Sequence, residues 1–203
     1  LGTAIQWGVK RGIYSNEAGQ GTGPMAAAAA EVSHPAKQGL VQAFSVYVDT
    51  LFVCSATAFM ILITGMYNVK DGADGFIVEN IPGVELGPAY TQMAVNTLIP
   101  GFGQAFVAIA LFFFAFTTLL AYYYYAETNV AYLFKGSKNH KTYFLITKIA
   151  LLGMTFFGAV RTADLDWAMG DIGVGAMAWL NIIAIILLTK VGVGTLKDYE
   201  RQK

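Results

Sequence analysis

GVKRGIYSNEAGQGTGPMAAAAA, residues 8–30, is the stretch that decides how the rest of this chain is interpreted. It starts within apolar sequence and then fills with residues that disfavour helix: glycines at positions 8, 12, 19, 21 and 23, followed by Pro24. Glycine permits positive φ and weakens helices, and proline removes a backbone donor. Five alanines at 26–30 favour a new helix, and Pro24 suits its first turn. The pattern predicts a discontinuous helix across residues 1–32, with irregular backbone at residues 8–23 between two half-helices.

The composition of the chain is that of a membrane protein. Of its 203 residues, 56% are hydrophobic and 13% are charged, and the mean hydropathy is +0.52. Soluble domains carry nearer a quarter charged residues, so we expect membrane lipid as a partner. The formal net charge of zero gives no indication of a nucleic-acid partner. The single cysteine, Cys54, excludes an intrachain disulfide, and a total of two histidines argues against a zinc site.

Irregular backbone has a special meaning at membrane depth. Each unpaired N–H or C=O group costs several kcal/mol there, so a break survives only where protein, water, an ion or a substrate satisfies those groups. Transporters use such breaks to bind small polar ligands. Ser15 and Asn16 add side-chain donors and acceptors beside the glycines, which suits an amino acid zwitterion. The alternative is a re-entrant turn with a purely structural role.

Four stretches carry a resemblance to a known family: GVKRGIYSNEAGQGTGP, AAAAAEVSHPAKQG, VDTLFVCSATAF and FFFAFTTLLAYYYYAE. They closely resemble the alanine or glycine:cation symporter family of bacteria and archaea, and the resemblance becomes looser after about Lys135. It implies an all-α membrane protein with a LeuT-like inverted-repeat fold and one discontinuous helix. It further implies sodium as the coupling ion without an organic cofactor, and small neutral amino acids as substrates. The sequence would then be the C-terminal half of a longer transporter chain, and the N-terminal half of that chain would be its missing partner.

Four apolar stretches are long enough to cross a membrane at about 1.5 Å per residue. The predicted spans lie at about 40–66, 101–127, 142–160 and 168–189. The outer loop that connects the first two spans is predicted at 67–100. Residues 89–98 of that loop are expected to form a short surface helix, and residues 190–203 a charged tail. The segment KGSKNHK (135–141) has three lysines and no acids, which indicates the cytoplasmic side. Alternation then places the C-terminus in the cytoplasm. The resemblance implies that the membrane is the cytoplasmic (inner) membrane of a prokaryote.

The resemblance implies which residues bind substrate. Gly12, Tyr14, Ser15 and Asn16 are the expected contacts, because the family's discontinuous helix lines the substrate site and these residues lie at the corresponding place. Tyr14 would limit the volume of the substrate side chain, which fits alanine or glycine. Trp167 is either an anchor at the membrane interface, the commoner role, or a residue that closes the substrate pocket, as a tryptophan near this point does in the family.

Charged residues near the break each have two interpretations. Glu17 is a candidate coupling carboxylate for a cation or a proton, or a cap for the N–H groups of the next half-helix, and capping is favoured. Asp49 lies about ten residues into its span, where acids are functional candidates by default. It is a second candidate coupling carboxylate, or a structural partner of Lys10 or Arg11. Those two basic residues are either interfacial anchors or charges that line a solvated interior.

The adjacent hydroxyls of Thr117 and Thr118 are candidate sodium ligands. Neutral hydroxyl oxygens suit a hard monovalent cation, although membrane threonines more often bond to their own helix carbonyls four residues earlier. The resemblance favours the sodium role, because LeuT-like carriers place a hydroxyl pair at this helix together with carbonyls from the first helix. The first-helix ligands are not in this chain.

The leading function is therefore sodium-coupled uptake of alanine, glycine or similar amino acids, which is transport and not enzymatic catalysis. The alternative is an intramembrane aspartyl protease that uses Asp49 and Asp171. Such a protease needs two carboxylates close together, whereas Asp171 is predicted near the outer end of its span and Asp49 nearer the inner end of its own. A third class, a non-catalytic membrane scaffold, would leave the polar cluster at the break without a role.

Overall fold

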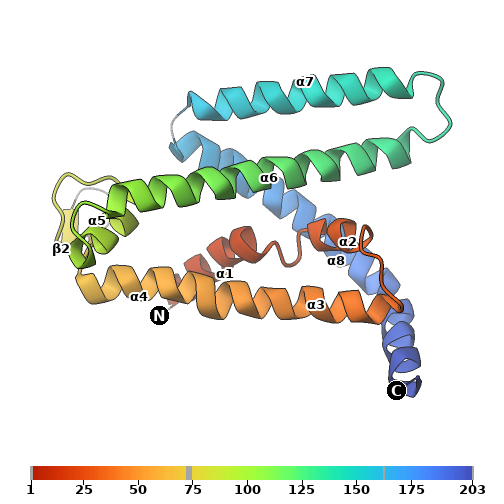
Figure 1. The fold of residues 1–203 in the computed structure, drawn as a ribbon, viewed down its shortest axis with the longest axis horizontal. Coiled ribbons are helices and arrows are strands. Elements are labelled where there is room, and N and C mark those ends of the chain that lie inside the picture. The colour runs from red at the N-terminus through yellow and green to blue at the C-terminus, as the bar shows by residue number, and fades with distance from the viewer. Residues whose placement is uncertain (1, 72–74, 162, 203) are drawn as a thin grey trace. The chain divides into compact units, whose positions relative to one another are not determined.

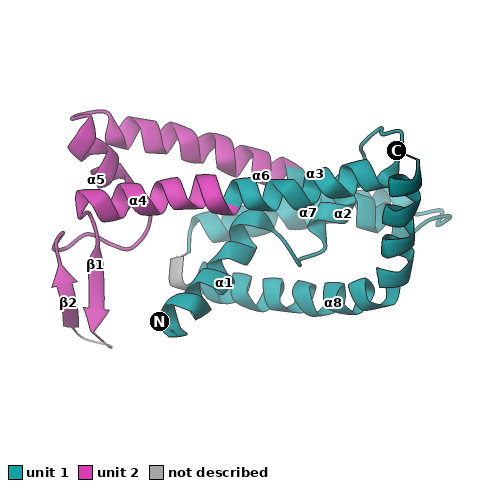
Figure 2. Ribbon diagram, turned by 90° about the horizontal axis from the view of Figure 1, so that it is seen from below, with its two compact units in different colours: residues 1–49, 121–203 teal, residues 50–120 magenta. Residues whose placement is uncertain are grey.

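A computed structural model of the chain describes residues 2–71, 75–161 and 163–202 (Figure 1). These residues are helical apart from one short hairpin and the connecting loops. They form two compact units, one of residues 1–49 with 121–203 and the other of residues 50–120 (Figure 2). The broken helix and the segments that contact it belong to the first unit.

The discontinuous helix has a shorter and later break than the sequence predicted. α1 (Gly2–Asn16) runs without interruption through the first glycines of the quoted stretch, and α2 (Thr22–Ala27) follows after five irregular residues. A single glycine inside a helix costs only about 1 kcal/mol relative to alanine, so α1 tolerates its isolated glycines. In the break itself Glu17, Gly19 and Gly21 have φ values of 53°, 92° and 86°. A right-handed helix cannot continue through such residues.

Residues 35–64 form one long helix that contains a wide turn. Its three parts are α3 (Pro35–Val48), the π-helical turn η1 (Asp49–Cys54) and α4 (Ser55–Thr64). The helix begins five residues before the predicted start at 40, because the His34 ring accepts a hydrogen bond from the Ala36 N–H at 3.2 Å and caps it. The π-helical turn was not predicted, since one extra residue in a turn leaves no mark in an almost uniformly apolar stretch.

Three further long helices follow later in the chain: α6 (Gly103–Leu133), α7 (His140–Ala159) and α8 (Ala163–Arg201). α7 folds back along the C-terminal part of α6 (Figure 1). Phe134, in the connection after α6, stacks on Tyr143 of α7 with ring centroids 3.9 Å apart. α8 continues past its predicted end at 189, so the expected charged tail is helical. Lysine, arginine and glutamate are good helix formers, and no proline interrupts this stretch.

Four helices of the described residues are long and apolar enough to cross a membrane. They are Pro35–Thr64, Gly103–Leu133, His140–Ala159 and Leu165–Arg201. At most 6% of the most apolar window in any of them is buried inside the chain. Because their apolar side chains face outward on nearly all sides, these helices are suited to lipid and to other membrane helices rather than to water. The chain is therefore mostly helical and has the character of a membrane protein.

The connection predicted as an outer loop contains regular structure in the second unit. β1 (Asn68–Asp71) pairs antiparallel with β2 (Gly75–Glu79), with one irregularity in the register. The Asn68 side chain closes the base of this hairpin, since it donates to the Ile81 carbonyl and accepts from the Ile81 N–H, both at 2.9 Å. The all-α prediction missed these two short strands.

α5 (Pro88–Leu98) is the short helix expected at 89–98, but it contributes to the core of the second unit instead of lying on the surface. The buried apolar residues of this core are Ile81, Tyr90, Ala94, Val95 and Val107. α5 approaches the start of α6 so closely that a Cβ on Gly103 would overlap the Gln92 carbonyl oxygen and lie 2.7 Å from the Asn96 nitrogen. Only glycine fits at this contact.

Candidate functional site

The four predicted substrate contacts lie at the C-terminal end of α1. Gly12, Tyr14, Ser15 and Asn16 are all helical, which corrects the expectation that they stand in irregular backbone. Gly12 has open space where a side chain would project, with no atom within 4 Å of an added Cβ. The other three side chains point to different neighbours, because successive residues of a helix are rotated by about 100°.

Ser15 and Asn16 connect the end of α1 to its surroundings. The Ser15 hydroxyl donates to Asp49 Oδ1 at 2.9 Å, so this candidate coupling carboxylate at the start of η1 lies beside a predicted substrate residue. The Asn16 side-chain oxygen accepts from the Ala18 N–H at 2.9 Å and satisfies a backbone donor inside the break. The structure thus brings Asp49 to the broken helix, as a functional carboxylate there would require.

Tyr14 and Trp167 pack against each other across α1 and α8. Their ring centroids are 5.4 Å apart and the rings are nearly perpendicular, at 77°. The Arg11 guanidinium lies 3.9 Å from the centre of the Trp167 ring, within the range of a cation–π contact. Trp167 therefore contacts Tyr14 directly. Neither ring is among the residues that line the cavity described below, so the role of Trp167 in closing a substrate pocket stays a prediction.

Asp171 on α8 is the acidic partner of α1. Lys10 Nζ lies 2.5 Å from Asp171 Oδ2, and Arg11 Nη1 lies 3.7 Å from Asp171 Oδ1. The Tyr14 hydroxyl donates to Asp171 Oδ1 at 2.9 Å. The described ion pairs of the two basic residues therefore run to Asp171, whereas the sequence had suggested Asp49 as their partner. Among the described residues, Asp171 collects two cations and a hydroxyl from one face of α1.

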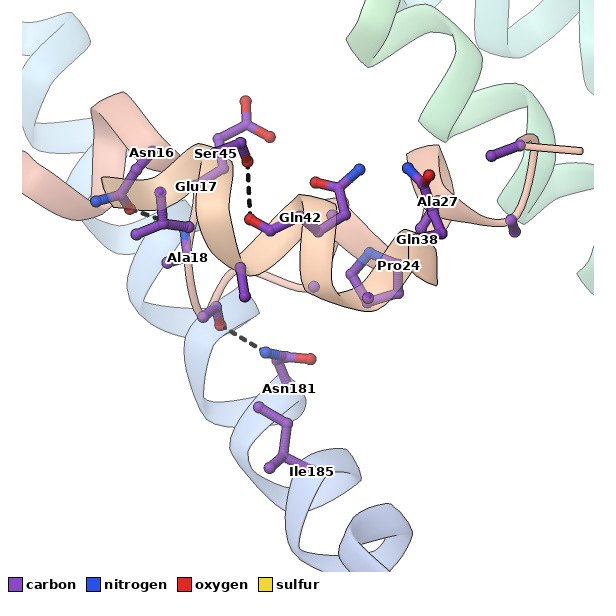
Figure 3. A pocket seen from close by; sticks show the side chains of 18 of the residues that line it. Asn16, Glu17, Ala18, Pro24, Ala27, Gln38, Gln42, Ser45, Asn181 and Ile185 are labelled. Atoms are coloured by element: carbon purple, nitrogen blue, oxygen red, sulfur yellow. Dashed lines mark hydrogen bonds between the residues drawn. The ribbon is translucent and has the colours of Figure 1, made fainter. Parts of the chain in front are cut away.

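A cavity of about 800 Å³ opens beside the break (Figure 3). Carboxamides supply much of its polar lining: Asn16, Gln38, Gln42 and Asn181. Asn181 of α8 donates to the Gly19 carbonyl at 3.0 Å, as the dashed line in Figure 3 shows. Gln38, Gln42 and Asn181 were not predicted as site residues, because a lone carboxamide in an apolar helix gives only the weak signal that it needs a hydrogen-bond partner.

Glu17 lines the same cavity. The prediction that it caps the next half-helix is wrong, since α2 begins after Gly21 without a side-chain cap. Its backbone instead forms the turn, with the Gln20 N–H donating to the Glu17 carbonyl at 3.2 Å. Its carboxylate interacts with Tyr122 and Tyr125 of α6. The side chain that was expected to cap α2 is thus directed to tyrosines, and its role as a coupling carboxylate stays a prediction.

Two polar side chains of the break are almost completely buried. Gln20 is 3% exposed and Thr22 is 1% exposed. Gln20 donates to the Ile13 carbonyl at 2.7 Å and so satisfies an acceptor at the end of α1. Gln20 Oε1 and Thr22 Oγ1 have no hydrogen-bond partner among the described residues. Two buried acceptors beside a broken helix are suited to a water molecule or a cation.

The two candidate sodium ligands belong to the second unit. The Thr117 hydroxyl donates to the Phe113 and Phe114 carbonyls at 2.9 Å and 3.1 Å, which is the alternative that the sequence analysis weighed. This bond uses the hydroxyl proton and leaves oxygen lone pairs for a cation. No group of three or more His, Cys, Asp or Glu side chains in the described part of the chain is arranged to hold a metal ion. The sodium role of Thr117 and Thr118 therefore stays a prediction.

A broken helix in a chain of long apolar helices, with carboxamides and carboxylates at the break, is typical of secondary transporters. Comparison with known proteins agrees with this class. The chain belongs to the Sodium:alanine symporter family, which matches residues 1–203. Members of this family are transporters and not enzymes. No solved structure matches the chain.

Three relatives show what this chain is similar to. It is 66% identical over its full length to the "Putative sodium/proton-dependent alanine carrier protein YrbD" of Bacillus subtilis and covers 42% of that protein. It is 63% identical to the sodium/proton-dependent alanine carrier protein of Bacillus sp. strain PS3, of which it covers 45%. Over 98% of its length it is 38% identical to the sodium/alanine symporter AgcS of Methanococcus maripaludis and covers 40% of it. The chain spans less than half the length of these relatives.

Gly21 provides a test of the break. Its φ is 86°, and an added Cβ would lie 3.3 Å from Asn181 Oδ1. Gly21→Ala should lower the thermal unfolding midpoint of the full-length protein in detergent, because a left-handed alanine costs about 1–2 kcal/mol. Gly23→Ala is the matched control, since its φ is not positive and its nearest neighbour would be Gln42 Oε1 at 3.9 Å. Equal midpoints for the two variants would contradict the described backbone.

Proposed function

We propose that the whole protein carries out sodium-coupled symport of small neutral amino acids, alanine and glycine foremost, across the cytoplasmic membrane of a prokaryote. The observation that carries the proposal is the match of the whole chain to the Sodium:alanine symporter family, together with 63% identity to a protein named as a sodium/proton-dependent alanine carrier. The coupling ion is sodium, and the remaining sodium ligands come from other parts of the full-length protein. The fold is LeuT-like with inverted repeats, and the C-terminus lies in the cytoplasm.

The chemistry of the break supports an amino acid as the ligand. The C-terminal end of α1 carries the negative end of the helix dipole and suits an ammonium group or a sodium ion. The hydroxyl of Ser15 and the carboxamide of Asn16 supply neutral polar groups within a few residues. Asp49, held by Ser15 at 2.9 Å, is a coupling carboxylate in this proposal, as is Glu17 on the cavity wall. In this proposal Tyr14 and Trp167, which pack against each other near the end of α1 and do not line the cavity, bound the space for the substrate side chain.

The protease alternative has no support from these findings. The family to which the chain belongs is one of transporters. The two carboxylates also have separate partners, since Asp171 is paired with Lys10 and Asp49 accepts from Ser15. An aspartyl dyad works by sharing one proton between two adjacent carboxyl groups, and a carboxylate held by a lysine is poorly suited to that.

Uptake measured with the purified full-length protein tests the function. Reconstituted into proteoliposomes, it should accumulate labelled alanine when sodium is more concentrated outside, and much less when choline replaces sodium. Dissipating the membrane potential should reduce accumulation, since sodium carries charge with a neutral substrate. Accumulation that follows a proton gradient and is unaffected by sodium would contradict sodium coupling, and the absence of alanine uptake would contradict the proposal as a whole.

The threonine pair provides a test of the ion site. Thr117→Val and Thr118→Val remove a hydroxyl oxygen while keeping the shape of the side chain. Each variant should raise the sodium concentration that half-activates uptake by about tenfold, the effect of one lost ligand worth roughly 1.4 kcal/mol. Thr155→Val on α7 is the control, because its hydroxyl also donates to the carbonyl four residues earlier, at 2.9 Å, and is given no ion role. If both variants kept the sodium activation of the wild-type protein, Thr117 and Thr118 would not be sodium ligands.

The substrate contacts predict two kinds of selectivity change. Tyr14→Ala should admit valine and leucine, because one methylene in an apolar pocket changes selectivity by roughly 1–3 kcal/mol. Ser15→Ala and Asn16→Ala should weaken all amino acids alike, by about 1–3 kcal/mol for each buried hydrogen bond lost, since every substrate shares the zwitterion. A competition assay with a panel of amino acids measures both effects. If Tyr14→Ala weakened all amino acids alike while Ser15→Ala or Asn16→Ala changed the size preference, the roles assigned to these residues would be reversed. If none of the three variants changed uptake, the break would have only a structural role.

A further inference from the structure

The orientation of α1 depends on contacts with its neighbours rather than on the continuity of the chain. α1 ends at Asn16, and Glu17, Gly19 and Gly21 of the connection to α2 have positive φ values, so α2 does not continue its direction. The side chains that tie α1 to α8 are Lys10, Arg11 and Tyr14, and all three interact with Asp171. The position of Tyr14 is therefore set largely from α8.

The two oxygens of Asp171 have different partners. Oδ2 pairs with Lys10 at 2.5 Å, whereas Oδ1 accepts from the Tyr14 hydroxyl at 2.9 Å and lies 3.7 Å from Arg11 Nη1. Lys10 thus holds the carboxylate in place, and the other oxygen holds the phenol. The edge of the Tyr14 ring is fixed in addition by Trp167, 5.4 Å away between centroids. A tyrosine held at both its hydroxyl and its ring has little rotational freedom.

Gly170 provides the space that this arrangement needs. An added Cβ at Gly170 would lie 2.9 Å from the Tyr14 hydroxyl oxygen and 3.5 Å from Cε1, the nearest ring carbon. The first distance is shorter than any normal contact, while the second is ordinary van der Waals contact. Gly170 thus leaves space for the hydroxyl in particular, next to Asp171, which accepts its hydrogen bond.

We propose that Asp171 and Gly170 are positioning residues that fix Tyr14 and thereby set the size of side chain that the substrate site accepts. Asp171 holds the hydroxyl, and Gly170 leaves the space in which the hydroxyl lies. The inference rests on the proposed function, in which Tyr14 bounds the substrate pocket. It assigns size selection to α8 as well as to the broken helix, although neither residue touches the substrate.

A comparison of two substitutions at Asp171 isolates the hydrogen bond. Asp171→Ala and Asp171→Asn both remove the charge that pairs with Lys10, but only asparagine keeps an oxygen that accepts from Tyr14. The measured quantity is the ratio of kcat/KM for alanine to that for valine, in proteoliposomes of the full-length protein. In Asp171→Ala this ratio should fall about tenfold, which is near the lower end of the selectivity that an apolar pocket exerts per methylene. Asp171→Asn should keep most of the ratio, even if both variants transport more slowly.

The glycine is tested by suppression. Gly170→Ala should also lower the alanine-to-valine ratio about tenfold, because its Cβ displaces the Tyr14 hydroxyl. In a Tyr14→Phe background the same substitution should have no further effect, since the atom that it displaces is gone. Gly173→Ala is the control on the same helix, with no atom within 4 Å of its added Cβ. The variants are compared at equal monodisperse yield, so that poor folding is recognised separately.

The outcomes separate this inference from the function on which it rests. If Tyr14→Ala relaxes size selection while Asp171→Ala and Gly170→Ala leave the ratio unchanged, the positioning role is wrong and the proposed function stands. If Gly170→Ala lowers the ratio equally in the Tyr14→Phe background, the steric argument is wrong. If the wild-type protein does not transport alanine, the proposed function fails first.

Discussion

Backbone groups inside a membrane must find hydrogen-bond partners, and the break between α1 and α2 meets this condition with carboxamides. Asn16 accepts from the Ala18 N–H, Gln20 donates to the Ile13 carbonyl, and Asn181 donates to the Gly19 carbonyl. Each bond replaces a helical one that the glycine-rich backbone cannot make. A carboxamide offers both a donor and an acceptor without a net charge, so it satisfies the backbone without the desolvation cost of an ion. The irregular segment can then persist between long apolar helices.

α8 contacts the broken helix at two places. Asp171 contacts the face of α1 before the break, and Asn181 contacts the loop within it. Ten residues of helix separate the two, about 15 Å along the axis. Because one rigid helix carries both contacts, a displacement of α8 acts on α1 and on the loop together. These side-chain contacts connect α8 to α1 and to the loop, although Tyr14 and Asp171 are 157 residues apart in the chain.

The sequence predicted the features that depend on local chemistry and missed those that depend on tertiary contacts. Glycines and a proline predicted a broken helix, and long apolar stretches predicted the helices that are suited to a membrane. The position of the break was wrong because helix tolerates isolated glycines, as at Gly12, and fails only where left-handed residues cluster. The pairing of Lys10 with Asp171 was missed because Asp49 alone was suggested as its partner, and no local signal in the sequence indicates which distant acid a basic residue meets. Trp7, Lys10, Arg11 and Tyr14 do recur at three- and four-residue spacing, which was a usable signal for one contact face.

The π-helical turn η1 changes how residues 35–64 should be aligned and compared. A π-turn takes in one residue more than an α-turn, and one α-helical residue corresponds to about 100° of rotation. Side chains of α4 are therefore out of phase with a wheel projected from α3. A relative with a single-residue deletion between Asp49 and Cys54 would present the same α4 surface from an uninterrupted α-helix. A one-residue gap at this point of an alignment would therefore leave the contacts of the helix unchanged. A one-residue gap elsewhere in residues 35–64 would rotate the side chains that follow it by about 100° away from their neighbours.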